Sequence, residues 1–421
     1  MSPLTNRGAR RWVRWMIPAA VLVSTACPPI DENPPGTTTT TNATTTSTSP
    51  TTTTPPSSGS VTRIAAGGAT AAVISRNGRY VAYASTSATP GTDGNGSGLD
   101  IFLVDRQTST TTRVTSGNGT SDSPSVADDG SVVFRSAATD LAGTDTNGHV
   151  DVFRWTSAGG VARVTDSLAD VTAPLLSADG ATVVFGGPTS LTSPTPPTRT
   201  ATFSWSPVAP SVLTQFETLG TDGSVPVAVG ADGVDVLLAE PGRLTLSSNP
   251  TATPVLVAAA PASPPAPQVT TFSVAPHALA ADGDVVFSVM TYSLEEASSE
   301  LTFQAGELRR WNRQDATSSV VPATGVPGAP VQSGDGQRVI HPDHAGVVVD
   351  QDDGGPFLPA AIRAVGVAGG PAVVVAGSPR AAFGTVSADG RYVAFVSTAT
   401  DLALPDANGS DADVYVWDRG A

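Results

Sequence analysis

The sequence of 421 residues contains no lysine, because all 22 of its basic residues are arginine. Schiff-base catalysis and the phosphate grip of P-loop proteins both need a lysine, so these chemistries are excluded. A single cysteine excludes an intrachain disulfide. Charged residues make up only 14% of the chain, well below the usual quarter, and aromatic residues make up 5%.

Glycine and proline, in contrast, are abundant, with 42 and 36 residues. Both residue types interrupt helices, which excludes a helical bundle. They favour many short strands joined by turns. The length allows two or three ordinary domains, or one large repeat architecture.

The first 26 residues are typical of an export signal. Four arginines precede the first acidic residue, and a mostly apolar stretch runs from Trp15 to Ala26. Twelve helical residues rise about 18 Å, which is too short to span a hydrocarbon core of about 30 Å. The only cysteine, Cys27, follows directly and resembles the cysteine of the bacterial lipoprotein lipobox, which is lipidated and becomes the mature N-terminus. We expect residues 1–26 to be removed and Cys27 to carry a lipid anchor; simple cleavage after Ala26, giving a secreted protein, is the alternative.

Residues 27–57 read as a stalk. From Thr37 to Pro56 the chain has 13 threonines in 20 residues, with no charge and no large apolar side chain. Such a segment cannot bury enough surface to offset its ordering entropy, so we expect it to be disordered and extended.

The charge balance limits the partners. Removing residues 1–26 takes four of the 22 arginines and no acidic residue, which leaves 18 basic against 37 acidic residues and a net charge of −19. Nucleic acid is therefore excluded as a partner, because its recognition needs basic surfaces. Basic peptides, cations and neutral glycans stay open. Any contact with a membrane is expected only through the lipid anchor.

A turn signature recurs seven times between residue 58 and the C-terminus. It is usually Asp-Gly before an apolar strand, and its glycines are spaced by 50 to 54 residues: Gly78, Gly130, Gly180, Gly233, Gly283, Gly336 and Gly390. A period of about 50 residues that is rich in short strands is typical of propeller blades. In each turn we expect glycine to supply a positive φ.

The ends of the chain share one more pattern. An arginine stands at a fixed place in a strand before the repeat glycines, as in TTRVT around Arg113 and VARVT around Arg163. The stretch VTRIA around Arg63 fits the same place, whereas the last repeat stops without such a strand. We therefore predict an all-β, seven-bladed propeller of four-stranded blades over residues 58–421. Its ring is closed by the N-terminal strand, which removes the exposed edges of an open array.

The last repeat resembles the WD40-like repeats of TolB-type propellers. The stretch from Ser387 to Arg419 reads SADGRYVAFVSTATDL followed by DANGSDADVYVWDR, and the first repeat reads SRNGRYVAYASTSA from Ser75. This resemblance implies a propeller fold and an interaction role at the cell envelope. It supplies no partner-binding residue, and the Thr-rich stalk stands where TolB itself has an α/β domain.

Three acidic loops carry the candidate metal ligands. Each places oxygen-bearing side chains at alternate positions before a glycine, which is the beginning of a calcium loop. The residues are Asp93, Asn95 and Asp100; Asp145, Asn147 and Asp151; and Asp406, Asn408, Asp411 and Asp413. Asn-Gly and Asp-Gly are also common hairpin residues, so a solvated turn is the alternative. Calcium is the one cofactor that the sequence indicates.

Two smaller features received structural interpretations. His341 and His344 lie close together, but no further metal ligand is nearby in the sequence, so we expect them to be polar surface residues. Leu294, Ala297 and Leu301 have helical spacing, which predicts a short helix inserted between Ser293 and Leu301.

No linear catalytic motif is present, and no catalytic residue is predicted. The sequence therefore favours a monomeric, exported propeller that binds a protein or glycan at the cell envelope without catalysis. A propeller hydrolase or lyase with an axial-channel site is one alternative, and a calcium-stabilised structural or adhesive surface protein is another.

Overall fold

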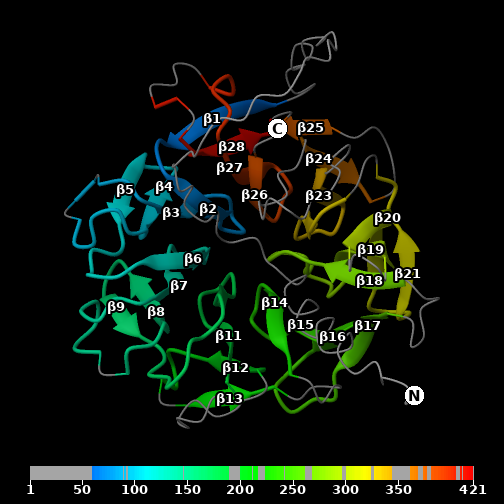
Figure 1. Ribbon diagram of the computed structural model, residues 1–421, viewed down its shortest axis with the longest axis horizontal. Helices are drawn as coiled ribbons and strands as arrows, with labels where there is room; N and C mark the ends of the chain where they lie inside the picture. The colour runs from blue at the N-terminus through cyan, green and yellow to red at the C-terminus, as the bar shows by residue number, and fades with distance from the viewer. Residues whose placement is uncertain are drawn as a thin grey trace, which may run out of the picture.

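The fold is known from a computed structural model. It describes residues 59–420 except 89, 92, 146, 189–199, 211, 217–222, 241, 261–267, 296–299, 324–326, 344–360, 368–372, 377–380, 404–407 and 410. The predicted signal peptide, the stalk and Cys27 lie outside the described residues. Within them the chain contains strands and no helix, so none is long and apolar enough to cross a membrane. Seven four-stranded antiparallel sheets form a ring (Figure 1), and this confirms the predicted propeller.

Each blade follows the chain order from its inner to its outer strand, here called strands a to d. Blade 1 has β2 (Ala69–Ile74), β3 (Tyr80–Ser85), β4 (Asp100–Asp105) and β5 (Thr110–Arg113). Blade 2 has β6 (Ser121–Val126), β7 (Val132–Ser136), β8 (Asp151–Thr156) and β9 (Gly160–Arg163). Blade 3 has β10 (Leu175–Leu176), β11 (Val183–Pro188), β12 (Thr200–Trp205) and β13 (Leu213–Gln215).

The second half of the ring repeats this plan. Blade 4 has β14 (Val225–Val229), β15 (Val236–Glu240), β16 (Arg243–Ser247) and β17 (Val255–Ala259). Blade 5 has β18 (Gln268–Ser273), β19 (Val285–Glu295), β20 (Glu300–Asn312) and β21 (Thr317–Val320). Blade 6 has β22 (Val331–Gln332), β23 (Arg338–Asp343), β24 (Ala361–Gly366) and β25 (Val373–Ala376).

Blade 7 combines the two ends of the chain. It has β26 (Ala381–Val386), β27 (Tyr392–Ser397) and β28 (Asp413–Asp418), and its outer strand is β1 (Ser60–Ala65). β1 pairs antiparallel with β28, from Ser60 opposite Asp418 to Ala65 opposite Val414. The predicted closure of the ring by the N-terminal strand is therefore confirmed (Figure 1).

The turns between strands a and b explain the repeated sequence signature. In blade 7, Ser387 Oγ donates a hydrogen bond to Asp389 Oδ1 (2.6 Å) and accepts one from the Tyr392 amide (2.9 Å). Asp389 Oδ1 also accepts one from the Arg391 amide (3.0 Å). The same three bonds recur at Ser75, Ser177 and Ser333. All seven repeat glycines have a positive φ, between 65° and 84°, as the turn requires.

The core lies between the blades. Side chains along strands b and c point alternately to the two faces of the sheet. One face of each sheet therefore packs on the preceding blade and the other on the following blade. Buried apolar clusters each join neighbouring blades, for example Val81 and Phe102 of blade 1 with Val396 and Val414 of blade 7. Aromatic pairs on adjacent strands stack within blades, such as Tyr83 on Phe102 with ring centroids 5.1 Å apart.

The helix predicted between Ser293 and Leu301 is wrong. β19 continues to Glu295 and β20 begins at Glu300, and Leu294 pairs with Leu301 across the two strands. Tyr292, Leu294, Leu301 and Phe303 alternate along these strands, and over so short a stretch this alternation competes with helical spacing. The strands of blade 5 are simply longer, with 11 and 13 residues.

Candidate functional site

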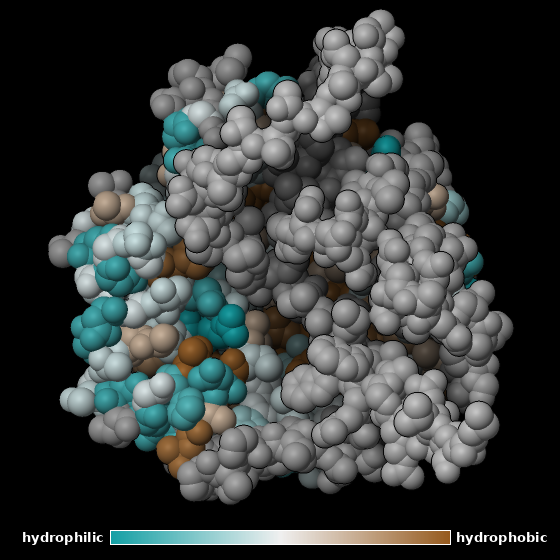
Figure 2. Space-filling view, viewed as in Figure 1, coloured by the Kyte–Doolittle hydropathy of each residue, from teal (hydrophilic) through white to brown (hydrophobic). Residues whose placement is uncertain are grey.

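The three predicted acidic loops belong to three consecutive blades of the ring. Each connects strand b to strand c, and each ends at the first residue of strand c: Asp413 in blade 7, Asp100 in blade 1 and Asp151 in blade 2. These three carboxylates are buried, each with 1% of its surface exposed. In the face-on view of Figure 2, hydrophilic side chains gather over blades 1 and 2.

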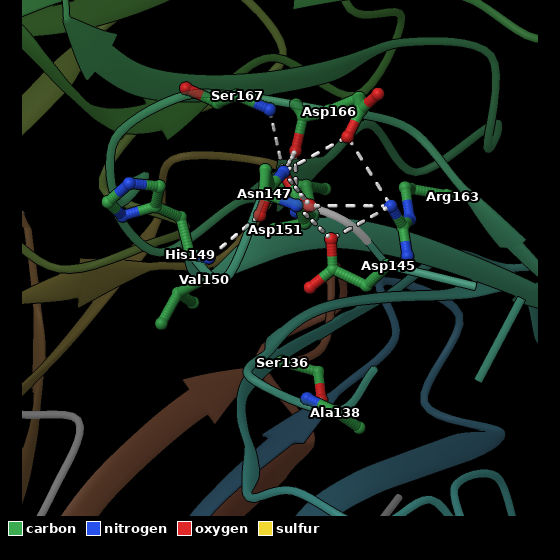
Figure 3. Close-up of polar contacts among 12 residues, drawn as sticks. Ser136, Ala138, Asp145, Asn147, His149, Val150, Asp151, Arg163, Asp166 and Ser167 are labelled. Carbon is green, nitrogen blue, oxygen red and sulfur yellow. Dashed lines mark hydrogen bonds and ion pairs between the residues drawn. The ribbon is translucent and has the colours of Figure 1, made fainter. Parts of the chain in front are cut away.

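Blade 2 contains the densest cluster (Figure 3). Arg163 Nη1 lies 3.3 Å from Asp145 Oδ1, 3.9 Å from Asp151 Oδ2 and 3.4 Å from Asp166 Oδ1. Asn147 Nδ2 donates hydrogen bonds to Asp151 Oδ2 (2.9 Å) and Asp166 Oδ1 (3.0 Å). Five side chains from the b–c loop, β8, β9 and the segment after β9 thus meet at one point, with nitrogen donors placed between the oxygens.

Two further donors complete the surroundings of Asp151. Thr165 Oγ1 donates to Asp151 Oδ1 (2.7 Å) and accepts a hydrogen bond from the Val152 amide (2.9 Å). The Ser167 amide donates to the same carboxylate oxygen at 3.1 Å. Both oxygens of this buried carboxylate therefore have hydrogen-bond donors.

Blade 1 repeats the arrangement. Arg113 Nη1 lies 2.5 Å from Asp100 Oδ2 and 3.9 Å from Asp93 Oδ1. Thr115 Oγ1 donates to Asp100 Oδ1 at 2.6 Å. Burial raises the pKa of Asp100, although the Thr115 hydroxyl and the Arg113 charge oppose that shift. Asn95 Nδ2 donates to the Gly119 carbonyl at 2.9 Å instead of to a carboxylate.

Blade 7 builds the same unit from both ends of the chain. Arg63 of β1 lies 3.2 Å from Asp413 Oδ2 of β28. Asn408 Nδ2 and the Gly67 amide each donate to Asp413 Oδ1 at 2.8 Å. Asp411 is exposed, and Asp406 lies outside the described residues.

We call this unit the Arg–Asp clamp: Arg63, Arg113 or Arg163 from strand d, with Asp413, Asp100 or Asp151 from strand c. The fixed place of these arginines in the sequence therefore has a structural cause, because each bonds the carboxylate that opens the neighbouring strand. The clamp joins strands c and d near the loop and fixes where the loop begins.

The clamps bear directly on the predicted calcium sites. Carboxylate oxygens of Asp145, Asp151 and Asp166 lie within 4.8 Å of one another and could hold a cation. The Arg163 guanidinium and the Asn147 amide already donate to these oxygens. A calcium ion would have to displace Arg163, because both would occupy the same oxygens. Calcium binding stays a prediction.

Two carboxylates of the same kind were missed by sequence reasoning. In blade 6, Asp343 ends strand b and bonds Arg363 of strand c, with Oδ2 2.5 Å from Nε. In blade 4, Glu240 ends strand b and accepts a hydrogen bond from Thr245 Oγ1 at 3.0 Å. In these two blades the acidic residue ends strand b instead of opening strand c. An alignment on strand c alone therefore does not find it. Counting seven residues from Gly336 or Gly233 would have found both.

His341 corrects a second expectation, because it is fully buried and not a surface residue. It stands five residues after Gly336, where blades 1 and 7 have the buried aromatic residues Tyr83 and Phe395. Burial lowers the pKa of His341. Its Nδ1 lies 3.0 Å from the Pro342 carbonyl oxygen. His344 lies outside the described residues.

The a–b turns are linked to one another around the ring. Backbone hydrogen bonds join turns of neighbouring blades, as from Ala388 N to the Arg76 carbonyl (2.6 Å) and from Asp128 N to the Ala178 carbonyl (2.8 Å). Arg76 reaches from blade 1 to blade 5, where Nη2 donates to the Leu279 carbonyl at 2.7 Å. Only 7% of Arg76 is exposed. Its side chain therefore crosses the axis at this end of the ring.

His277 lies beside this crossing. Its Nδ1 is 3.1 Å from the Val386 carbonyl oxygen of blade 7, and its φ is 71°. Burial, together with the positive charge of Arg76, lowers the pKa of His277 to about 3. The imidazole is therefore neutral at pH 7, and no general base with a pKa near neutrality results from this pair.

Comparison with known proteins supports the fold alone. No protein-family model matches the sequence, and no curated protein matches it. Among solved structures, an oligogalacturonate lyase in complex with manganese superposes with a TM-score of 0.51 at 13% identity, over 86% of this chain and 94% of the lyase. The β-propeller domain of the Trilobed protease from Pyrococcus furiosus, which has an open velcro topology, gives 0.50 at 10% identity, over 84% and 95%.

TolB from Acinetobacter baumannii gives a TM-score of 0.39 at 11% identity, over 82% of this chain and 64% of TolB. The seven four-stranded sheets make the chain a seven-bladed β-propeller, the fold that the resemblance of its repeats implies. At these identities the neighbours carry no activity over to it.

Proposed function

We propose that this protein is an exported β-propeller, anchored by a lipid at Cys27, that binds a protein or glycan at the cell envelope without catalysing a reaction. The basic and apolar N-terminal segment and the position of the only cysteine support export and anchoring. The place of β1 supports a tethered domain. It is the outer strand of blade 7, so the preceding chain meets the propeller at its rim and not at its axis.

The observation that carries the non-catalytic role is that the buried charged side chains already form ion pairs and hydrogen bonds within the protein. Asp100, Asp151 and Asp413 are each bonded to an arginine of the next strand. Arg76 is bonded to a main-chain carbonyl across the axis. Catalytic acids and bases need a pKa suited to proton transfer and access to a substrate, and these groups are held by structural bonds instead.

One observation motivates the alternative of a lyase or hydrolase. The lyase neighbour has the same fold, but at 13% identity that likeness concerns the fold alone. The second alternative, a calcium-stabilised surface protein, depends on the cluster in blade 2, where Arg163 would have to give way.

Anchoring is tested by detergent phase partition of the full chain against a Cys27→Ser variant. We expect the parent in the detergent phase and the variant in the aqueous phase. Equal partition of the two proteins would contradict the anchor.

Catalysis is tested on the same preparations. The full chain is incubated with oligogalacturonate and manganese, and the ultraviolet absorbance of an unsaturated product is followed. We expect no product at any protein concentration. Product that increases with protein concentration, and that a mock preparation does not form, would overturn the non-catalytic role.

A further inference from the structure

A hollow lies between blades 3 and 4, on the side of the ring that carries the a–b turns. Its volume is about 330 Å³, and no charged residue lines it. It is bounded by Thr182, Trp205, Ser206, Phe216, Gly233 and Val234. Pockets for small organic groups begin near this size and combine apolar walls with a few polar atoms.

The same place is filled at the junction of blades 7 and 1. A Cβ on the turn glycine Gly78 would lie 2.6 Å from the Tyr392 ring, so the ring packs directly beneath that turn. The Arg106 guanidinium covers this ring at 4.0 Å from its centroid, and Arg106 Nη1 also donates to the Gly78 carbonyl. A tyrosine ring and a stacked cation therefore close this junction.

The corresponding residues at the junction of blades 3 and 4 are short. Thr182 follows its repeat glycine by two residues, as Tyr392 follows Gly390. Ser248 comes directly after strand c of blade 4, as Arg106 comes directly after strand c of blade 1, and Ser248 also lines the hollow. The contact with the next turn is kept, because a Cβ on Gly233 would lie 2.3 Å from Thr182 Oγ1. The ring and the cation are missing, and the hollow takes their place.

Two aromatic side chains form the walls of this hollow. Trp205 is 7% exposed and Phe216 is 3% exposed. The indole is fixed, because Trp205 Nε1 donates a hydrogen bond to the Pro210 carbonyl at 2.9 Å. Fixed aromatic walls favour a flat ring as the guest, since offset and edge-to-face contacts between rings are stabilising.

The rim indicates that the guest belongs to a polypeptide. Val208 is 90% exposed, Val212 53% and Val234 50%. Exposed branched apolar side chains beside a pocket extend the apolar surface beyond the area of one ring, which is typical of protein contacts. Both sides of the hollow contribute exposed valines. Val208 and Val212 lie in the loop between β12 and β13 of blade 3, and Val234 follows the turn of blade 4.

Charge narrows the guest further. The mature chain carries −19, and two described charges bond lining residues: Arg313 Nη2 donates to Ser248 Oγ at 2.9 Å, and Asp232 Oδ1 accepts a hydrogen bond from the Val234 amide at 3.1 Å. Arg313 is itself paired with Asp235. An anionic ring would meet an acidic protein and an already neutralised arginine, so charge complementarity selects an uncharged ring.

We propose that this hollow binds the tyrosine side chain of a partner polypeptide, with apolar residues beside that tyrosine resting on the rim valines. The guest takes the place that Tyr392 occupies at the junction of blades 7 and 1. The site does not depend on where the protein resides, so it can fail while the lipid anchor stands, and the reverse also holds.

The test is titration of the full chain with the neutral peptide acetyl-Val-Tyr-Val-amide. Binding is measured during the titration by calorimetry or by ligand-observed NMR. We expect binding at least about tenfold tighter than that of N-acetyltyrosinamide, which lacks the flanking valines. We expect the anionic N-acetyltyrosine to bind still more weakly. Equal affinity for the peptide and N-acetyltyrosinamide would overturn the polypeptide as guest, and no binding of either would overturn the site.

Filling the hollow is the second arm. Thr182→Tyr places in blade 3 the residue that blade 7 has, and we expect at least about a tenfold loss of peptide affinity with an unchanged or higher melting temperature. Ser206→Arg closes the space from the other side and decides the matter if the first variant does not fold. Val255→Tyr adds a ring on the outer strand of blade 4, away from the lining, and should bind as the parent does. Unchanged affinity in a folded Thr182→Tyr or Ser206→Arg variant contradicts the proposal.

Discussion

The junction of blades 7 and 1 and the junction of blades 3 and 4 share one turn geometry but differ in what fills the space beneath it. In the first, Tyr392 and Arg106 stack under Gly78. In the second, Thr182 and Ser248 stand at the corresponding positions, and a hollow of about 330 Å³ lies between aromatic walls.

The same division runs through the rest of the molecule. Blades 7, 1 and 2 carry the Arg–Asp clamps, whereas blades 3 to 6 keep little of the repeat beyond the turn. The repeated residues of this protein therefore stabilise the ring. The proposed binding site lies at a junction where these residues are replaced by shorter ones.

Removing the closing strand should have the largest effect. Deletion of residues 59–65 takes away β1 and the Arg63 clamp, and it exposes the edge of β28. We expect aggregation, or a melting temperature lower by more than about 10 °C in scanning calorimetry. Deletion of residues 37–56, which leaves β1 intact, should melt as the parent does. Equal melting of the two deletions would mean that β1 does not close the ring.

Breaking one clamp should have the next largest effect. Asp151→Ala removes one of the three carboxylates that contact Arg163, and it removes the buried acceptor of Thr165 Oγ1 and of the Ser167 amide. We expect a loss of about 3 kcal/mol in the free energy of unfolding, measured by urea denaturation. Asp170→Ala is the matched control, since its side chain is 69% exposed and lies on the segment between β9 and β10, where it contacts His149 of the acidic loop. It should cost less than about 0.5 kcal/mol. A similar loss in both variants would remove the special role of the clamp.

Calcium separates the clamp from a metal site. If Arg163 occupies the place of a cation, 5 mM calcium, about the upper limit for weak extracellular sites, should not raise the melting temperature of chelator-treated parent protein. In Arg163→Gln the oxygens of Asp145, Asp151 and Asp166 lose that donor. We therefore expect this variant to gain a shift with calcium of a few degrees. A calcium shift already present in the parent would favour the metal interpretation of the acidic loops.

The smallest effect concerns acid stability at the opposite end of β4. Hydrogen bonds from Arg79 hold the pKa of Asp105 well below its usual range, with distances of 2.9 and 2.6 Å. A carboxyl group whose pKa is lowered by folding stabilises the fold above its unfolded value, and this contribution is lost as the pH falls toward the folded value.

When the pH is lowered from about 4.5 to 2, the melting temperature of the parent should therefore fall further than that of Asp105→Asn. Since the Arg79 side chain is 40% exposed, solvent screens this pair, so the difference should be small and should shrink with salt. Parallel melting curves over this range would assign the acid sensitivity to other carboxyl groups.

Much of this fold could be predicted because its signals are local and repeated. All seven turns have a positive φ at glycine, and four of them also use a serine hydroxyl two residues before an aspartate or asparagine; both signals are visible in the sequence. The arginine of strand d identified β1 as the missing outer strand, because the place of Arg63 matches that of Arg113 and Arg163.

What could not be predicted depends on contacts between strands. The burial of His341 follows from its place opposite strand c, and the segment around Leu294 fitted helical and strand spacing equally well. The acidic loops resembled calcium loops because the arginine that fills them comes from a strand 12 or more residues away. The hollow did leave a signal, since Thr182 stands where blades 1 and 7 have a tyrosine and Ser248 stands where blade 1 has an arginine.

The most direct test of this division between structural and binding blades is one set of melting curves with and without acetyl-Val-Tyr-Val-amide, for the parent, Asp151→Ala and Thr182→Tyr. We expect Asp151→Ala to melt at a lower temperature and still gain stability from the peptide, as the parent does. We expect Thr182→Tyr to melt at the parent's temperature or above it and to gain nothing from the peptide. A peptide shift that is lost in Asp151→Ala but kept in Thr182→Tyr would contradict the account, because binding would then reside in the repeated blades.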